Sequence, residues 1–132
     1  MTTESRHICI SVARSAADVY DYAANPAYLP EWAAGLGGSI AHVDGKWIAD
    51  SPMGQVVVSF ADRNTYGVLD HYVTLPSGET VHNPMRVLAD GTGCEVVFTL
   101  RRRPGTSDEE FSADADAVTA DLARLKRLLE RH

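Results

Sequence analysis

Residues 39–103 alternate between apolar and polar side chains almost throughout, and this pattern constrains the fold more than any other feature of the sequence. Successive side chains of a β-strand point to opposite faces of the sheet, so the alternation predicts strands with one buried face. Short turns such as Asp44-Gly45 and Asp90-Gly91 separate the segments, and short turns join antiparallel neighbours. Together with an earlier alternating segment, the predicted strands are 7–13, 39–44, 46–51, 54–61, 67–75, 79–88 and 93–102.

A long amphipathic helix is predicted after the last strand, over residues 107–131. Ser107 and Glu110 have the spacing of a capping box at its start. A sheet of this length cannot bury one face alone, so the helix must cover it. The sequence therefore predicts an α+β fold in which a curved, seven-stranded antiparallel sheet wraps around the helix. Apolar side chains recur along this helix at intervals of three and four residues and form one stripe: Phe111, Ala115, Val118, Leu122, Leu125 and Leu129.

Two short helices are predicted between the first and second strands. Ser15 and Asp18 form an acidic variant of the capping box at the start of the first helix. This helix ends at Asn25-Pro26, because the residue before a proline avoids the helical region of backbone space. A second short helical piece is predicted near residues 30–34.

The composition restricts the classes of function. The chain has 132 residues, 45% of them hydrophobic, which predicts a single globular domain over 1–132. Its net charge of −6 repels phosphates, so a nucleic-acid partner is not expected. No apolar run approaches the ~20 residues of a membrane span. Residues 1–7 lack the pattern of a signal peptide, and we expect a cytoplasmic protein.

Neither the cysteines nor the histidines form a recognisable site. Cys9 falls on the outer face of its predicted strand and Cys94 on the inner face of another, and opposite faces do not allow disulfide geometry. The five histidines show no metal-ligand spacing. We therefore expect two reduced cysteines, no metal and no cofactor.

The order of the predicted elements resembles that of the START-like helix-grip superfamily (SRPBCC), which includes polyketide cyclase/dehydrase, lipid-transfer and birch-pollen-allergen-like branches. Residues 10–22 are similar to its entry motif, and Asn25-Pro26 with 29–32 match the segment that follows. The resemblance covers nearly the whole chain. It implies a helix-grip domain that holds a hydrophobic ligand between the sheet and the C-terminal helix. The superfamily has no common catalytic triad, so no catalytic position carries over.

The register of two predicted hairpins places a polar pair inside the sheet. A three-residue loop at 76–78 pairs Val73 with Val81, His71 with Asn83, and Leu69 with Met85. A loop at 89–92 then pairs Val87 with Cys94, Met85 with Val96, Asn83 with Phe98, and Val81 with Leu100. The resulting inner face is apolar except at His71 and Asn83. Buried polar groups cost free energy unless they are hydrogen-bonded.

Two interpretations of His71 and Asn83 follow. Either they bond to each other or to a trapped water, or they face a cavity and anchor a ligand there. The predicted ligand-binding residues are Trp32, Phe60, Leu69, His71, Asn83, Met85, Phe98, Phe111, Val118 and Leu122.

Three functions fit this sequence. The first is binding of a small hydrophobic or aromatic ligand, lipid-like or polyketide-like. The second is a polyketide cyclase/dehydrase-type enzyme in which His71 acts as general base on a carbonyl-bearing substrate. The third is a protein-interaction module with a filled core. The sequence leaves the oligomeric state and the identity of the ligand open.

Overall fold

The computed structural model describes residues 3–36 and 38–131; Met1, Thr2, Gly37 and His132 lie outside the described residues. The strands are β1 (Ser5–Val12), β2 (Ile40–Val43), β3 (Lys46–Ser51), β4 (Gly54–Phe60), β5 (His71–Thr74), β6 (Thr80–Asn83), β7 (Met85–Asp90) and β8 (Gly93–Arg101). The helices are α1 (Ala16–Ala23), α2 (Leu29–Trp32) and α3 (Asp108–Glu130), with short 3₁₀ turns at Pro26–Tyr28 and Ala34–Leu36.

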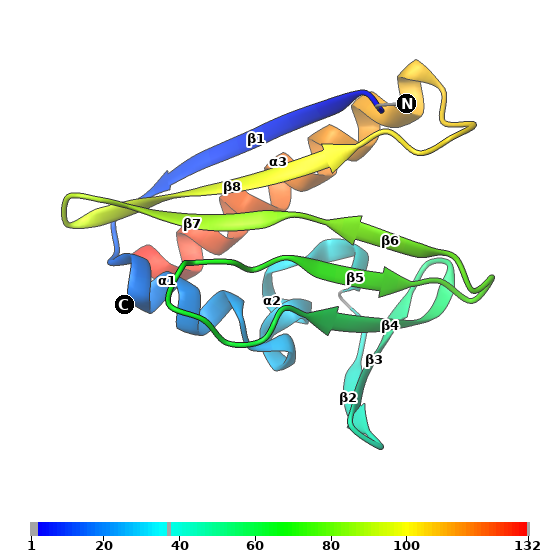
Figure 1. Cartoon of the computed structure of the whole chain (residues 1–132), viewed down its shortest axis with the longest axis horizontal. Helices are drawn as coiled ribbons and strands as arrows, with labels where there is room; N and C mark the ends of the chain where they lie inside the picture. Colours follow the sequence, from blue (N-terminus) through cyan, green and yellow to red (C-terminus); the bar gives the residue numbers. More distant parts are fainter. Residues whose placement is uncertain (1–2, 37, 132) are drawn as a thin grey trace.

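The strands form two antiparallel sheets. One sheet has the order β1-β8-β7 and the other the order β2-β3-β4-β5-β6. Every pair of strands in them is antiparallel, as the sequence predicts. Figure 1 shows the long helix α3 crossing behind β1, β8 and β7. The α+β class is thus confirmed, whereas the expectation of seven strands in a single sheet is wrong.

Pro84 accounts for the extra strand. The predicted strand 79–88 divides there into β6 and β7, because proline has no N–H to donate to a ladder. Residues 67–69, which precede β5, pair with β7. The N–H of Leu69 donates to the carbonyl of Met85 over 2.8 Å, and the N–H of Val87 donates to that of Gly67 over 2.9 Å. The segment 67–69 therefore joins the two sheets, and only 71–74 of the predicted strand 67–75 belongs to β5.

One of the two predicted hairpin registers is confirmed and the other is wrong. In β5–β6, His71 lies opposite Asn83 and Val73 opposite Val81, as predicted. In β7–β8, Met85 lies opposite Phe98 rather than Val96, and Ala89 rather than Val87 lies opposite Cys94. The turn contains two residues and not four, because Asp90 pairs with Gly93. The predicted partners on β8 are wrong by two residues. Because side chains alternate between faces with a period of two, the same side chains still lie on the inner face.

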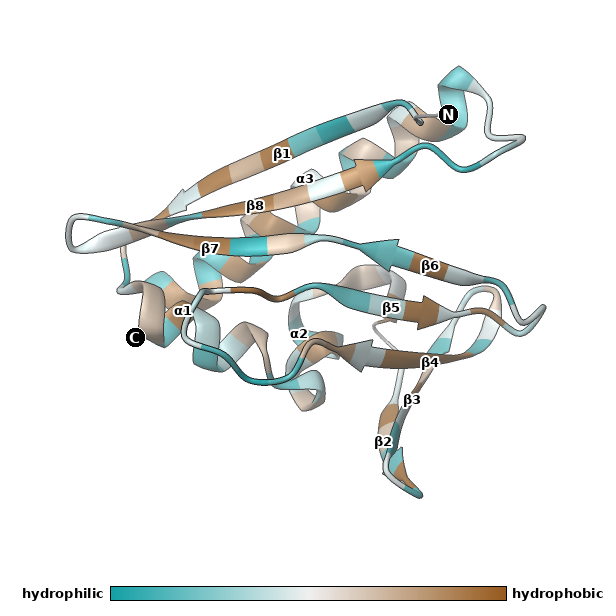
Figure 2. Ribbon diagram, viewed as in Figure 1, coloured by the Kyte–Doolittle hydropathy of each residue, from teal (hydrophilic) through white to brown (hydrophobic). Residues whose placement is uncertain are grey.

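Helix α3 begins and packs as predicted. Ser107 Oγ accepts from the N–H of Glu110 over 3.1 Å, and the Glu110 carboxylate accepts from the N–H of Ser107 over 3.0 Å, which completes the capping box. The apolar stripe faces the sheet, with Phe111, Leu122 and Leu125 fully buried. Figure 2 shows hydrophobic stretches along β1, β7 and β8, the strands that α3 crosses.

The segment between β1 and β2 has more helical pieces than predicted. Ser15 caps α1 as expected, because its Oγ accepts from the N–H of Asp18 over 3.1 Å. After Asn25 the chain turns helical again at once. The Asn25 side chain accepts from the N–H of Ala27 over 3.0 Å, and proline at Pro26 fits a first helical turn. Consequently α2 lies between two 3₁₀ turns, earlier than the predicted piece at 30–34.

The last turns of α3 contact the outer edge of β1. Lys126 Nζ donates to the carbonyl of Ser11 over 2.6 Å, and Glu130 Oε2 accepts from the N–H of Ala13 over 2.8 Å. The two side chains also form an ion pair at 2.8 Å. Since β1 is the end strand of its sheet, these bonds engage backbone groups that no neighbouring strand reaches.

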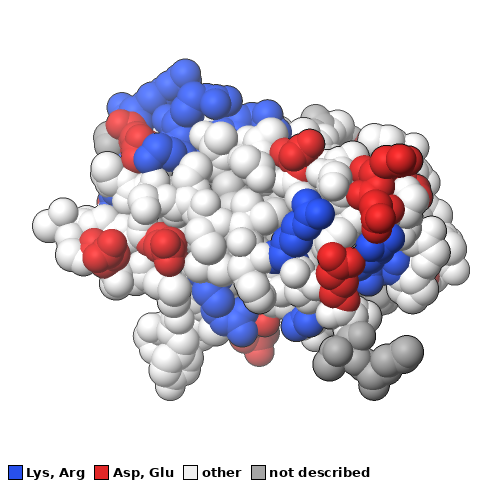
Figure 3. All heavy atoms as spheres, turned by 90° about the horizontal axis from the view of Figure 1, so that it is seen from above, with Lys and Arg blue, Asp and Glu red and all other residues white. Residues whose placement is uncertain are grey.

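The surface carries charges of both signs, and Figure 3 shows basic and acidic side chains interspersed on one face. Several form ion pairs, among them Arg102 with Glu4 at 2.9 Å and Arg14 with Asp18 at 2.8 Å. Among the described residues, no helix is both long and apolar enough to cross a membrane.

Candidate functional site

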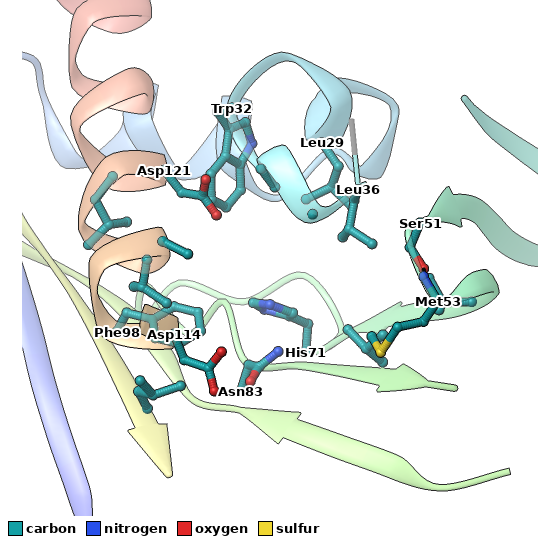
Figure 4. A pocket seen from close by; sticks show the side chains of 18 residues that line it. Leu29, Trp32, Leu36, Ser51, Met53, His71, Asn83, Phe98, Asp114 and Asp121 are labelled. Carbon is teal, nitrogen blue, oxygen red and sulfur yellow. Dashed lines mark hydrogen bonds between the residues drawn. The ribbon is translucent and has the colours of Figure 1, made fainter. Parts of the chain in front are cut away.

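A cavity of about 280 Å³ lies between the sheets on one side and α2 and α3 on the other. Figure 4 shows Trp32 and Asp121 at its helical wall and His71 and Asn83 at its sheet wall. Most of the remaining wall is aliphatic. The cavity therefore occupies the place where the sequence predicts one, between the sheet and the C-terminal helix.

Six of the predicted ligand-binding residues line this cavity: Trp32, His71, Asn83, Phe98, Val118 and Leu122. They come from α2, β5, β6, β8 and α3, which the fold brings together from distant parts of the sequence. Whether they contact a ligand stays a prediction.

The other four predicted residues lie outside the cavity wall. Leu69 and Met85 are fully buried at the junction of the two sheets. Phe60 lies next to His71, with ring centroids 4.8 Å apart. Phe111 is buried near the start of α3, under the guanidinium groups of Arg6 and Arg102, which lie 4.8 Å and 5.6 Å from its ring centre. An inward-facing side chain can thus fill the core without reaching the cavity.

His71 is the buried polar residue of the cavity wall, with 5% of its surface exposed. Its Nδ1 lies 3.0 Å from the carbonyl oxygen of Leu69. A carbonyl oxygen only accepts, so this bond fixes the proton on Nδ1 and leaves Nε2 as an acceptor. Burial lowers the pKa of the imidazole below its ordinary value, which keeps the ring neutral near pH 7.

The environment of His71 narrows the two interpretations of the polar pair. His71 and Asn83 are cross-strand neighbours, and both line the cavity. The described part of the chain has no hydrogen bond between the two side chains, and it offers no partner to Nε2 of His71 or to the amide of Asn83. The two side chains are therefore not satisfied by bonding to each other, which was one form of the first interpretation. A trapped water or a ligand in the cavity is left to satisfy them.

Two carboxylates also line the cavity, and sequence reasoning missed both as site residues. Asp121 is partly buried, and its Oδ1 accepts from the N–H of Ala34 over 3.1 Å and from Arg124 over 2.7 Å. Burial raises the pKa of Asp121, and these two hydrogen bonds oppose the rise. Asp114 is exposed at the edge of the cavity. Their spacing could have revealed them. Asp114 and Asp121 lie four residues before and three residues after Val118, so all three share one face of the helix, at the edge of the apolar stripe.

Trp32 adds an unsatisfied donor to the helical wall. Proline at position 30 starts the single turn of α2, which holds the indole against α3. The Arg124 side chain donates to the carbonyl of Trp32 over 3.3 Å and so ties α2 to α3. The indole Nε1 is buried, and no acceptor for it exists in the described part of the chain.

The exposed lining residues mark the mouth of the cavity. Met53, 61% exposed, lies in the turn between β3 and β4, and Gly35 lies in the 3₁₀ turn after α2. On α3, Asp114 and Ala117 are exposed lining residues. Leu29, Trp32, Val56, His71, Phe98 and Leu122 form the buried inner end.

This arrangement can hold a mostly apolar molecule that carries a few polar groups. Nε2 of His71 can accept a hydrogen bond, and Asn83 can both donate and accept. A neutral imidazole facing a cavity can also accept a proton from a bound molecule.

Comparisons with known proteins place the fold. The sequence matches no protein-family model and no curated protein. A solved protein from Bacillus thuringiensis superposes with a TM-score of 0.74 at 13% identity, covering 96% of this chain and 98% of that one. Ara h 8.0201 superposes with 0.74 at 11% identity, covering 98% and 99%. Truncated norcoclaurine synthase from Thalictrum flavum superposes with 0.66 at 14% identity, covering 100% and 98%.

Identities this low show a shared fold alone. The chain has the START-like helix-grip fold, which confirms the resemblance found in the sequence.

Proposed function

We propose that this protein binds a small, largely apolar molecule in the cavity between the sheets and α3, and that His71 anchors it. The observation that carries the proposal is the state of His71. Its ring is 95% buried, its Nδ1 is bonded to Leu69, and its Nε2 has no partner among the described residues although it belongs to the cavity wall. Nε2 has no acceptor or donor partner in the described part of the protein, so only a molecule that enters the cavity can bond to it, and a ligand donor can replace water there.

The size of the cavity limits the ligand. Small-molecule sites span ~300–1,000 Å³, and a cavity of about 280 Å³ lies just below that range. A molecule of one to three small rings fits such a volume, whereas a lipid with two long chains does not. We therefore favour a compact aromatic or alicyclic ligand over a membrane lipid.

A second candidate function is catalysis on a carbonyl-bearing substrate. The observation that favours it is the combination of a neutral His71 and a carboxyl group, Asp121, whose pKa is raised by burial. A neutral imidazole and a carboxyl group would then line the same cavity, where the sequence alone offered only one histidine. The third function considered, a module with a filled core, is disfavoured by the cavity itself.

Dye binding to two matched variants tests the proposed function. N-phenyl-1-naphthylamine is an uncharged dye, made of a naphthalene and a phenyl ring, that fluoresces in apolar surroundings. Ala117→Trp places a large side chain at the mouth, and Ala120→Trp places the same side chain at an exposed position of α3 away from the cavity. We expect Ala117→Trp to weaken dye binding by about tenfold or more and Ala120→Trp to leave it unchanged.

Melting curves of both variants accompany the titration, so that a loss of folding is not mistaken for a blocked cavity. If the wild-type protein does not bind the dye, or if both tryptophan variants bind it as the wild type does, the proposed function is wrong.

A further inference from the structure

We infer that the cavity selects a positively charged ligand, an amine attached to a compact apolar ring body, and that Asp114 is its counter-ion. This inference rests on the proposed function, because it assigns the chemistry of a ligand in that same cavity.

The charged residues of the cavity wall all have one sign. Asp114 and Asp121 line the cavity, and no Lys or Arg side chain is among the described residues that do so. The outer surface differs, since Figure 3 shows basic and acidic side chains interspersed on the face it displays. A wall with only negative charge repels carboxylates and phosphates and attracts cations. Fatty acids and phospholipids are thus disfavoured by charge.

The two carboxylates are not equivalent. Asp121 is already neutralised in part, because Arg124 donates to its Oδ1 at 2.7 Å and the N–H of Ala34 donates to the same atom. Asp114 has neither a basic neighbour within ion-pair distance nor a hydrogen-bond donor among the described residues. The uncompensated charge of the wall is therefore at Asp114, at the mouth of the cavity. A ligand ammonium there would keep contact with water while the ring body enters the apolar interior.

The interior supplies the second, independent observation. His71 is 95% buried, and its Nε2 is an acceptor without a partner in the described chain. Figure 4 shows the Asp114 side chain reaching from α3 toward Asn83, with His71 beside Asn83 on the sheet wall. Asp114 and His71 both accept hydrogen bonds, so these two groups match ligand donors, whereas the indole Nε1 of Trp32, unpaired among the described residues, matches a ligand acceptor. An amine at the mouth and a hydroxyl or ring N–H farther in satisfy both acceptors.

A set of three ligands that differ mainly in charge tests the inference. Each competes with N-phenyl-1-naphthylamine: 2-(1-naphthyl)ethylamine, a cation near pH 7; 2-(1-naphthyl)ethanol, its neutral counterpart; and 3-(1-naphthyl)propanoate, an anion. We expect the amine to bind about tenfold more tightly than the alcohol, since hydrogen bonds to charged groups are the stronger ones, and the anion to bind most weakly.

Two conservative variants then assign the effect to one residue. Asp114→Asn should remove the preference for the amine, so that the amine binds no more tightly than the alcohol. Asp116→Asn, which removes the same charge from the solvent-exposed side of α3, should leave the preference intact. Equal affinities of the wild type for amine and alcohol, or a preference that survives in Asp114→Asn, would overturn the inference while dye binding still supports the proposed function. Absence of dye binding by the wild type overturns both.

Discussion

The carboxylate of Asp70 accepts a hydrogen bond from the backbone N–H of Met85 over 2.9 Å, at the place where Pro84 interrupts the sheet. The same oxygen accepts from the guanidinium of Arg86. Met85 is fully buried, so its N–H depends on this side chain. Asp70 thus supplies an acceptor at the junction of the two sheets.

Removing that carboxylate should destabilise the fold. We expect Asp70→Ala to lower the free energy of unfolding by about 1–3 kcal/mol, because a buried N–H loses its acceptor. Urea unfolding measures the change. Asp62→Ala, in the exposed loop after β4, is the control and should change stability by no more than ~0.5 kcal/mol. Equal losses in the two variants would contradict the role of Asp70.

The stability of the protein should fall as the pH is lowered from 7 to 5, and part of this fall should come from His71. Burial holds the pKa of His71 below the ordinary 6.5, so the folded state keeps the ring neutral while the unfolded chain takes up a proton. The stabilisation is complete above pH 6.5 and is lost progressively below it.

The variant His71→Asn isolates this contribution, since asparagine does not titrate. The drop in Tm between pH 7 and pH 5 should be smaller in this variant than in the wild type. The exposed His82 and the neighbouring Asp70 are present in both proteins and serve as an internal reference. An identical drop in both proteins would show that His71 is protonated in the folded state as readily as in the unfolded chain.

The apolar stripe of α3 should matter far more to stability than its outer face. Phe111 is 2% exposed, whereas Asp116 is exposed. We expect Phe111→Ala to cost about 3–5 kcal/mol through the lost burial and the cavity it leaves. Asp116→Ala should stay within ~0.5 kcal/mol. Thermal unfolding of both variants checks the difference, and similar shifts in Tm would mean that α3 does not close the core.

The two cysteines should react with thiol reagents at very different rates. Both are free; Cys9 is exposed on β1 and Cys94 is buried on β8, as their predicted faces require. Burial also raises the pKa of the Cys94 thiol, which lowers its thiolate fraction. Titration of the folded protein with a disulfide reagent should modify one thiol rapidly, and denaturation should release the second. Two fast thiols, or none after denaturation, would contradict this assignment.

Local chemistry made the ends of the elements predictable. Ser107 with Glu110 and Ser15 with Asp18 are caps whose bonds depend only on neighbours in sequence. The register of β5–β6 was predictable too, because a slip by one residue would place Leu69 against a charged side chain. The turn of β7–β8 lacked such a constraint. A slip by two residues keeps every side chain on its own face, so the pattern could not distinguish a loop of four residues from one of two.

The cavity was only partly predictable for a related reason. Alternation places His71, Phe98 and Met85 on the inner face, but it does not say how far each lies from the helices. Met85 fills the junction, whereas Phe98 reaches the cavity wall. Asp114 and Asp121 were missed because charged residues on a helix usually face solvent. Only the packing of α3 against α2 and the sheets shows that these two aspartates, at the edge of the apolar stripe, line the cavity.

The bonds from Lys126 and Glu130 to β1 have a consequence for the behaviour of the protein at high concentration. An end strand with free backbone groups is a template on which strands of other chains can add, and this is a common route to aggregation. Here two charged side chains occupy part of that template at Ser11 and Ala13. The C-terminal end of α3 should therefore hinder the addition of a strand from another chain at this edge, in addition to packing against the core.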